Sequence, residues 1–178
     1  MRPSFILCMR EDEAHFFAGL LGLRSEEVRW VTSRELGNAL DEIVGRARLI
    51  SFCSDVIIPA ATIETLEGEC FNFHSGPPER PGYRPTSFAA VRGDTHFGVT
   101  FYRLVPEVDA GTIYATRRFV LSPPMTEAQV SELAYLELLK MAREVAPLLA
   151  DFNADFLPNG DVWQGIPTTR ADYHLLLS

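Results

Sequence analysis

The sequence predicts an α/β fold, a doubly wound and mostly parallel sheet with an antiparallel strand pair in its second half and a long helix near its carboxyl end. Residues 4–74 alternate short apolar runs with amphipathic segments, which is the pattern of parallel strands joined by helices. Two apolar runs, 97–105 and 111–121, are separated by only five residues, which favours an antiparallel pair. With 178 residues, 47% of them apolar, we expect one domain spanning residues 1–178.

The first half supplies four strands and three helices in alternation. The expected strands are apolar runs rich in aromatic and branched residues: 4–9, 28–33, 47–54 and 69–74. The expected helices carry apolar residues at helical spacing: 13–22, 33–47 and 59–68. Ser33 is a suitable N-cap for the second helix, and Leu36, Ala39, Leu40, Ile43, Val44 and Ala47 form its apolar stripe. Pro59 opens the third helix and Gly68 stops it.

The second half has a different pattern. The acidic segment PEVDA, residues 106–110, joins the antiparallel strands. A long helix over residues 126–152 begins with a capping box formed by Thr126 and Gln129, and Pro147 predicts a kink or an end. The tail, residues 163–178, is expected to be ordered.

Charge and cysteine content exclude several classes of function. The formal net charge of −8 argues against sequence-independent binding to nucleic acid or to anionic membranes. The first apolar run has only five residues, which is too short for a signal peptide core, so we expect a cytoplasmic protein. Cys8, Cys53 and Cys70 form no CxxC pair and are expected to be buried thiols.

The segment CFNFHSGPPERPGY, residues 70–83, carries a polar pair at the end of a strand. Residues two apart in a strand share a face, so Asn72 and His74 point together while Phe71 and Phe73 face the core. Ligands of open α/β sheets bind beyond the carboxyl ends of the strands. A carboxamide and an imidazole could hold a carbonyl oxygen that becomes negative. The alternative is that both side chains merely cap the strand end.

Several motifs follow one another between residues 50 and 120: Asn72-x-His74, a proline-rich loop reaching Gly82, a small helix to Gly93-Asp94, Gly98-Val99-Thr100, and Asp109 before Ala110-Gly111. In this order they resemble the formyltransferase family that uses 10-formyltetrahydrofolate. Glycinamide ribonucleotide and methionyl-tRNA formyltransferases are its best-known members. The resemblance implies a Rossmann-like formyltransferase fold and a role in one-carbon metabolism.

The resemblance also implies a reaction and its residues. It makes Asn72, His74 and Asp109 catalytic in the transfer of a formyl group from 10-formyltetrahydrofolate to the amine of a small-molecule acceptor. Asn72 and His74 would stabilise an oxyanion, Asp109 would pair with His74 and help relay the proton, and Thr100 would support the site. On spacing alone, Asp109 is an ordinary turn residue. The motifs leave open hydrolysis of the same donor and a non-catalytic role as a folate-binding or ligand-binding accessory protein.

The resemblance places the folate between two loops. Asp55, Val56, Ile57 and Ile58 align with the loop whose backbone holds the pterin, and Pro106, Glu107 and Val108 would close over it. The alternative is that residues 56–58 are ordinary core. A metal site built from His74, Asp94, His96 and Asp109 lacks metal-ligand spacing on any single element, so no metal is expected.

The acceptor and the oligomeric state are not determined by these motifs. Where the ribonucleotide enzymes carry a glycine turn for a phosphate, residues 9–13 read Met-Arg-Glu-Asp-Glu. A phosphate-bearing acceptor is therefore not expected at this turn. The chain also lacks the basic surface of the tRNA enzymes. The tail residues Trp163, Thr168, Thr169, Arg170, Asp172 and Tyr173 either border the acceptor pocket or attach the end of the chain to the body.

Overall fold

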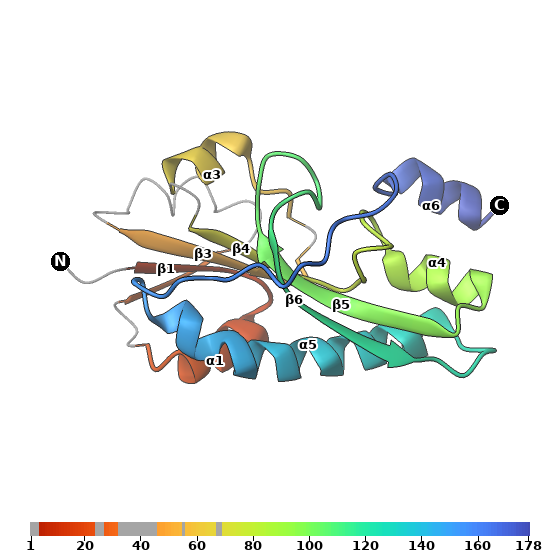
Figure 1. Cartoon of the computed structure of the whole chain (residues 1–178), viewed down its shortest axis with the longest axis horizontal. Coiled ribbons are helices and arrows are strands. Elements are labelled where there is room, and N and C mark those ends of the chain that lie inside the picture. Colours follow the sequence, from red (N-terminus) through yellow and green to blue (C-terminus); the bar gives the residue numbers. More distant parts are fainter. Residues whose placement is uncertain (1–3, 24–26, 32–45, 55, 67–68) are drawn as a thin grey trace.

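The fold is seen in a computed structural model that describes residues 4–23, 27–31, 46–54, 56–66 and 69–178. Within them the strands form one mixed sheet in the order β2-β1-β3-β4-β5-β6. Figure 1 labels five of these strands, all except β2. Their bounds are β1 Ser4–Cys8, β2 Val28–Val31, β3 Ala47–Phe52, β4 Cys70–His74, β5 His96–Arg103 and β6 Ile113–Val120. The pairs among β2, β1, β3 and β4 are parallel, whereas β5 is antiparallel to both β4 and β6. The predicted fold class is confirmed.

Helices cover both faces of this sheet. Their bounds are α1 Glu11–Leu20, α3 Ala60–Thr65, α4 Pro85–Arg92, α5 Glu127–Ala150 and α6 Arg170–Leu176. α1 and α5 lie on one face and α3 on the other (Figure 1). α5 begins with the predicted capping box, in which the Thr126 hydroxyl accepts from the Gln129 backbone N–H. None of the helices in the described part of the chain is both long and apolar enough to cross a membrane.

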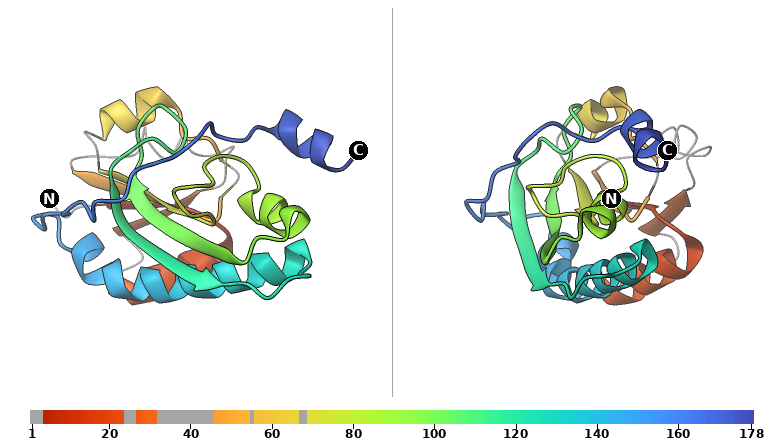
Figure 2. Two further views of the ribbon diagram at one scale, coloured as in Figure 1. Left: turned by 45° about the vertical axis from the view of Figure 1, so that its right-hand side comes forward. Right: turned by 90° about the vertical axis from the view of Figure 1, so that its right-hand side faces the viewer.

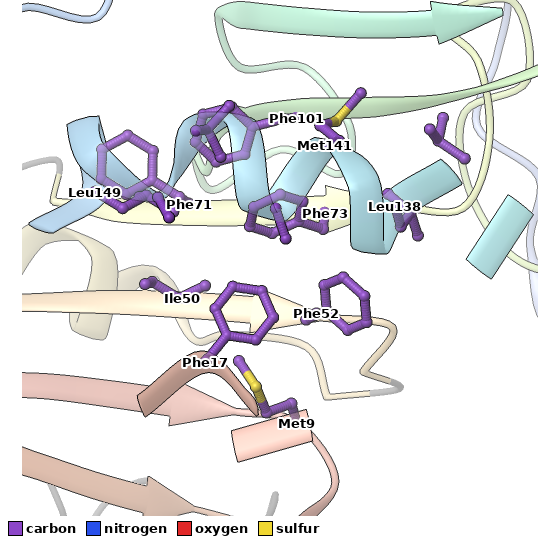
Figure 3. Close-up of a cluster of buried hydrophobic side chains, with 14 of the residues drawn as sticks. Met9, Phe17, Ile50, Phe52, Phe71, Phe73, Phe101, Leu138, Met141 and Leu149 are labelled. Atoms are coloured by element: carbon purple, nitrogen blue, oxygen red, sulfur yellow. The ribbon is translucent and has the colours of Figure 1, made fainter. Parts of the chain in front are cut away.

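Aromatic side chains fill the space between the sheet, α1 and α5. Phe17 of α1, Phe52 of β3 and Phe73 of β4 meet with ring centroids 5.1 to 5.5 Å apart (Figure 3). Each is fully buried or nearly so, and burying a side chain of this size contributes about 1.5–3 kcal/mol. Phe71 and Phe73 belong to this core, so the other face of β4 is free to carry Asn72 and His74.

The long helix continues past Pro147 to Ala150, and a buried arginine donates hydrogen bonds to its last carbonyl oxygens. Arg48 of β3 is 1% exposed and donates from Nη1 to the Leu149 carbonyl oxygen at 2.6 Å, while its Nε donates to Glu69 at 2.7 Å. Burial lowers the pKa of the Arg48 guanidinium. These bonds join the end of α5 to the sheet.

Two sequence predictions differ from the structure. Ala47, assigned to both a helical stripe and a strand, is the first residue of β3, and the rest of the predicted helix 33–47 lies outside the described residues. Cys8 and Cys70 are buried as expected, but Cys53 is exposed. Cys53 follows the last residue of β3 and has a φ of 48°, so it turns out of the sheet.

The chain after α5 runs along the outside of the molecule to α6 (Figure 2). Its backbone N–H groups donate at three points: Asn159 to Ile113 O, Gln164 to Pro78 O and Thr168 to Pro81 O. The tail is therefore ordered, as predicted, and it lies against the loop that follows β4.

Candidate active site

Four polar side chains lie on one face of the antiparallel pair β4 and β5. His74 is directly opposite Thr100, and Asn72 is directly opposite Tyr102. The period of two along each strand places them on the face opposite the aromatic core. His74, Thr100 and Tyr102 are buried, and Asn72 is half-buried.

The connection between β5 and β6 brings a buried carboxylate to these residues. Asp109 has a φ of 45° and is 7% exposed. Its Oδ2 accepts a hydrogen bond from the Gly82 backbone N–H at 2.6 Å and lies 3.6 Å from His74 Nδ1. Its Oδ1 accepts from the Tyr102 hydroxyl at 2.5 Å. Asp109 thus links the strand pair to the proline-rich loop.

Tyr102 connects Asn72 to Asp109, and the sequence motifs did not identify it as a site residue. The Asn72 Nδ2 group donates to the Tyr102 hydroxyl at 3.0 Å, and that hydroxyl in turn donates to Asp109. Burial raises the pKa of Tyr102 well above its ordinary value, and the negative charge of Asp109 raises it further. The available signal was its position two residues after Thr100, which puts both on one strand face.

The loop after β4 closes over the histidine. Thr100 Oγ1 donates to the Gly76 carbonyl at 2.8 Å, and His74 Nε2 lies 3.2 Å from the Arg80 carbonyl. A Cβ on Gly76 would lie 2.7 Å from His74 Nε2, so a larger residue would collide with the ring. A carbonyl can only accept, so this contact requires a proton on Nε2. The other ring nitrogen faces Asp109.

Trp163, from the tail, covers the same residues. Its ring makes edge contacts with Tyr102 and His74, at centroid distances of 4.9 and 5.7 Å. Its Nε1 donates to the Gly111 carbonyl at 2.8 Å, which holds the ring against the loop between β5 and β6. Thr168 instead bonds to the backbone of residues 81–83. Both alternatives considered for the tail therefore apply to part of it: Trp163 borders the polar cluster, and Thr168 attaches the tail to the body.

A cleft of about 700 Å³ lies between the loop 107–113 and the tail segment 158–167. Asp109 lines it and also contacts His74, so the cleft reaches the polar cluster. Its other charged lining residues are Glu107 and Asp161, and none of the lining residues that the structure describes is basic. Its walls are otherwise formed largely by apolar residues, glycine and proline.

The residues aligned with the folate loop lie near the face covered by α3. Ile57 is 82% exposed, whereas Ile58 is buried in a second core cluster with Val56 packed against it. Asp55 lies outside the described residues. On the opposite loop Pro106, Glu107 and Val108 are exposed, and the latter two line the cleft. The side chain of Ile58 thus serves the core, which leaves its backbone for the proposed contact.

A carboxylate already occupies the first strand-helix turn. The Arg10 backbone N–H donates to Glu13 Oε2 at 3.0 Å, and the Arg10 side chain bonds to the other oxygen of the same carboxylate. Glu13 is 2% exposed. A phosphate at this turn would meet a buried negative charge.

This arrangement provides hydrogen-bond donors, a titratable ring and a carboxylate within one connected network. Such a set can stabilise negative charge on a carbonyl oxygen and move a proton. Among the described residues, no group of three or more His, Cys, Asp or Glu side chains is placed to hold a metal ion.

The sequence of the chain is similar to that of known formyltransferases. A methionyl-tRNA formyltransferase from Listeria welshimeri is 31% identical over 110 residues, which cover 61% of this chain and 33% of the relative. The chain thus matches about a third of that relative's length. No family model matches the chain.

Solved structures share the fold across almost the whole chain. An N-formyltransferase from Helicobacter canadensis, in complex with folinic acid and dTDP-3-aminofucose, has a TM-score of 0.75 at 12% identity and covers 96% of this chain and 72% of its own. A phosphoribosylglycinamide formyltransferase from Anaplasma phagocytophilum has a TM-score of 0.66 at 14% identity, covering 89% and 94%. The chain therefore has the formyltransferase fold and is similar in sequence to methionyl-tRNA formyltransferases, which confirms the family resemblance that its motifs indicate.

Proposed function

We propose that this protein transfers a formyl group from 10-formyltetrahydrofolate to the amine of a small-molecule acceptor. The observation that carries the proposal is that Asn72, His74 and Asp109, which belong to separate family motifs, meet at the end of β4, where Asp109 contacts His74 directly and Asn72 through the Tyr102 hydroxyl. A protein that only binds a ligand has no need for a donor, an imidazole and a buried carboxylate in one network.

The chemistry assigns a task to each of these groups. The acceptor nitrogen bonds to the formyl carbon, the bond from that carbon to the donor's N10 breaks, and the amine proton finally reaches N10. Asn72 and His74 donate hydrogen bonds to the formyl oxygen while it carries negative charge, an effect worth roughly 3 kcal/mol per donor. Asp109 stabilises the protonated ring of His74 and takes part in moving the proton. The bond from Nε2 to Arg80 must be exchanged for one to the formyl oxygen.

The formyl donor is proposed to lie between the segment 55–58 and residues 106–108. The exposed Ile57 and Val108 offer apolar surface, and the loop backbones offer hydrogen-bonding groups to a flat heteroaromatic ring. No metal is needed in this scheme, because the polarising groups are all side chains of this chain.

The acceptor is proposed to enter by the cleft between residues 107–113 and 158–167. Within the described ranges its lining residues include three carboxylates and no basic side chain. Arg118 pairs with one of them, Asp161, so the charges of Glu107 and Asp109 are the ones that favour the approach of an amine-bearing molecule. The Helicobacter protein was crystallised with an amino sugar nucleotide, which supports a small-molecule amine as the acceptor class. The net charge of −8 is unfavourable for tRNA.

The test is turnover of 10-formyltetrahydrofolate with a panel of amines, comparing the wild type with His74→Ala. We expect His74→Ala to lose at least about 100-fold in rate while remaining folded, because His74 lies on the polar face of β4 and does not belong to the aromatic core. His96→Ala is the matched control, since His96 is an exposed histidine at the start of β5 and should leave the rate unchanged.

Other outcomes separate the competing functions. Release of formate without an amine would show a hydrolase instead. Tight binding of 5-formyltetrahydrofolate without turnover of the formyl donor would show a binding protein. An unfolded His74→Ala, judged by circular dichroism, would show that the residue serves to cap the strand.

A further inference from the structure

The Tyr102 hydroxyl lies between two of the proposed catalytic residues and contacts both. It accepts from Asn72 Nδ2 at 3.0 Å and donates to Asp109 Oδ1 at 2.5 Å. Tyr102 is 2% exposed, and the Trp163 ring stands edge-on to it at 4.9 Å. No substrate can therefore reach this hydroxyl, and any effect it has on the reaction must act through its two partners.

The direction of these bonds follows from the chemistry of the three groups. A carboxylate only accepts, so the single proton of the Tyr102 hydroxyl is directed at Asp109. Burial and the charge of Asp109 raise the pKa of Tyr102, so the proton stays on the phenol oxygen at neutral pH. That oxygen can then only accept from its other neighbour. Asn72 must consequently present its amide nitrogen, and not its carbonyl oxygen, to Tyr102.

The orientation of a carboxamide is otherwise not determined by its shape. The two ends of the asparagine side chain are nearly equal in size but opposite in hydrogen bonding, so a half turn exchanges donor for acceptor. In Asn72 one N–H is used by Tyr102, which leaves the second N–H of the same group directed away from the tyrosine. A reversed amide would present an acceptor where the formyl oxygen needs a donor.

We infer that Tyr102 is a positioning residue that sets the orientation of the Asn72 side-chain amide. Its hydroxyl also bonds to one carboxylate oxygen of Asp109, so that the other oxygen faces His74. The inference rests on the proposed formyl transfer. It goes beyond the catalytic trio, because the residue that aligns the trio lies on the neighbouring strand and never meets the substrate.

The first test compares Tyr102→Phe with Tyr114→Phe. Tyr114 is a half-buried tyrosine of β6 that packs on Phe71, Phe101 and Phe156, and its hydroxyl is not part of this network. We expect Tyr102→Phe to lower kcat by about 10- to 100-fold, since misplacing a catalytic group by about 1 Å costs that much. The KM for 10-formyltetrahydrofolate should change by less than about threefold, because Tyr102 does not touch it. Tyr114→Phe should leave both constants unchanged.

A double-mutant cycle distinguishes positioning from a general structural role. If Tyr102 acts through Asn72, adding Tyr102→Phe to Asn72→Ala should cost less than about threefold further in kcat. A structural role would lower the rate by a similar factor in both backgrounds. Full additivity, or an equal effect of Tyr102→Phe and Tyr114→Phe, would overturn the inference.

A measurement without turnover keeps this inference separate from the proposed function. In spectra of the ¹⁵N-labelled protein, the side-chain amide protons of Asn72 should exchange with water at least about tenfold faster in Tyr102→Phe than in the wild type. If the wild type transfers no formyl group, the proposed function fails, and the amide exchange alone decides whether Tyr102 orients Asn72. Equal exchange rates in the two proteins would refute the orientation.

Discussion

Replacing Asp109 by asparagine keeps the shape of the side chain but removes its charge and turns one acceptor oxygen into a donor. In the structure both oxygens accept hydrogen bonds, from the Gly82 N–H at 2.6 Å and from the Tyr102 hydroxyl at 2.5 Å. Wherever the new amide nitrogen is placed, it meets a donor. Against Gly82 the conflict cannot be relieved, because a backbone N–H has only one role. Against Tyr102 the hydroxyl can reverse, but Asn72 must then turn its amide.

The cost can be worked from these contacts. Losing one charge-assisted bond and weakening the other costs about 2–4 kcal/mol of unfolding free energy, since bonds to charged groups contribute about 1.5–3 kcal/mol and neutral ones about 1. The lost charge lies 3.6 Å from His74 Nδ1. The carboxylate at this distance holds the ring in the orientation that the proposed proton movement needs. Its loss, together with the disturbed hydrogen bonds, should lower kcat by about 10²- to 10³-fold.

The assay is tetrahydrofolate formation at saturating donor and amine, combined with urea unfolding. Glu132→Gln is the matched control, because it removes a carboxylate from an exposed position of α5 that has no place in the proposed site, and it should change kcat by less than about twofold. A folded Asp109→Asn variant with kcat within about threefold of the wild type would refute the reasoning, because it would show that the charge beside His74 has no part in turnover.

Three further predictions concern the loop, the acceptor and the pH dependence. Gly82→Ala should cost at least about 2 kcal/mol and most of the activity, since Gly82 has a φ of 97° and its new Cβ would lie 2.2 Å from Thr168 N. Gly160→Ala, with a φ of 89° but no atom within 4 Å, should cost only about 1 kcal/mol, and equal urea midpoints for the two variants would contradict this account. Because residues 9–13 carry acidic groups, glycinamide ribonucleotide should be formylated no faster than glycinamide itself, and a clear preference for the ribonucleotide in a competition assay would show the turn to be a phosphate site. In the unfolded chain tyrosine loses its proton near pH 10, whereas in the folded protein the raised pKa of Tyr102 keeps its hydroxyl protonated at that pH. The contribution of Tyr102 to the free energy of unfolding is therefore complete below about pH 10 and is lost as the pH rises further. Urea unfolding of Tyr102→Phe should therefore show a shallower loss between about pH 10 and 11, and parallel curves for the two proteins would rule out this contribution.

Much of the fold could be predicted because its signals are local. The alternation of apolar and polar residues in CFNFH follows from strand geometry and placed Asn72 and His74 on one face and the phenylalanines on the other. The capping box at Thr126 likewise depends on residues only three positions apart. Pro147 was a weaker signal, because the helix continues past it to Ala150, where tertiary bonds from Arg48 hold the final carbonyls.

The sequence by itself determined that Asn72 and His74 share one face at the end of a strand, and the family resemblance of its motifs pointed to Asp109 in the turn between two later strands. Only the tertiary structure decided what surrounds them. The register between β4 and β5 sets Tyr102 opposite Asn72, and the tail brings Trp163 onto His74 from 89 positions along the chain. Such contacts join segments that have no local pattern in common, and a hydrogen bond depends on distances and angles that only the packed chain defines. The residues proposed for the chemistry could thus be named from the sequence motifs, whereas the residues that contact and cover them could be named only from the fold.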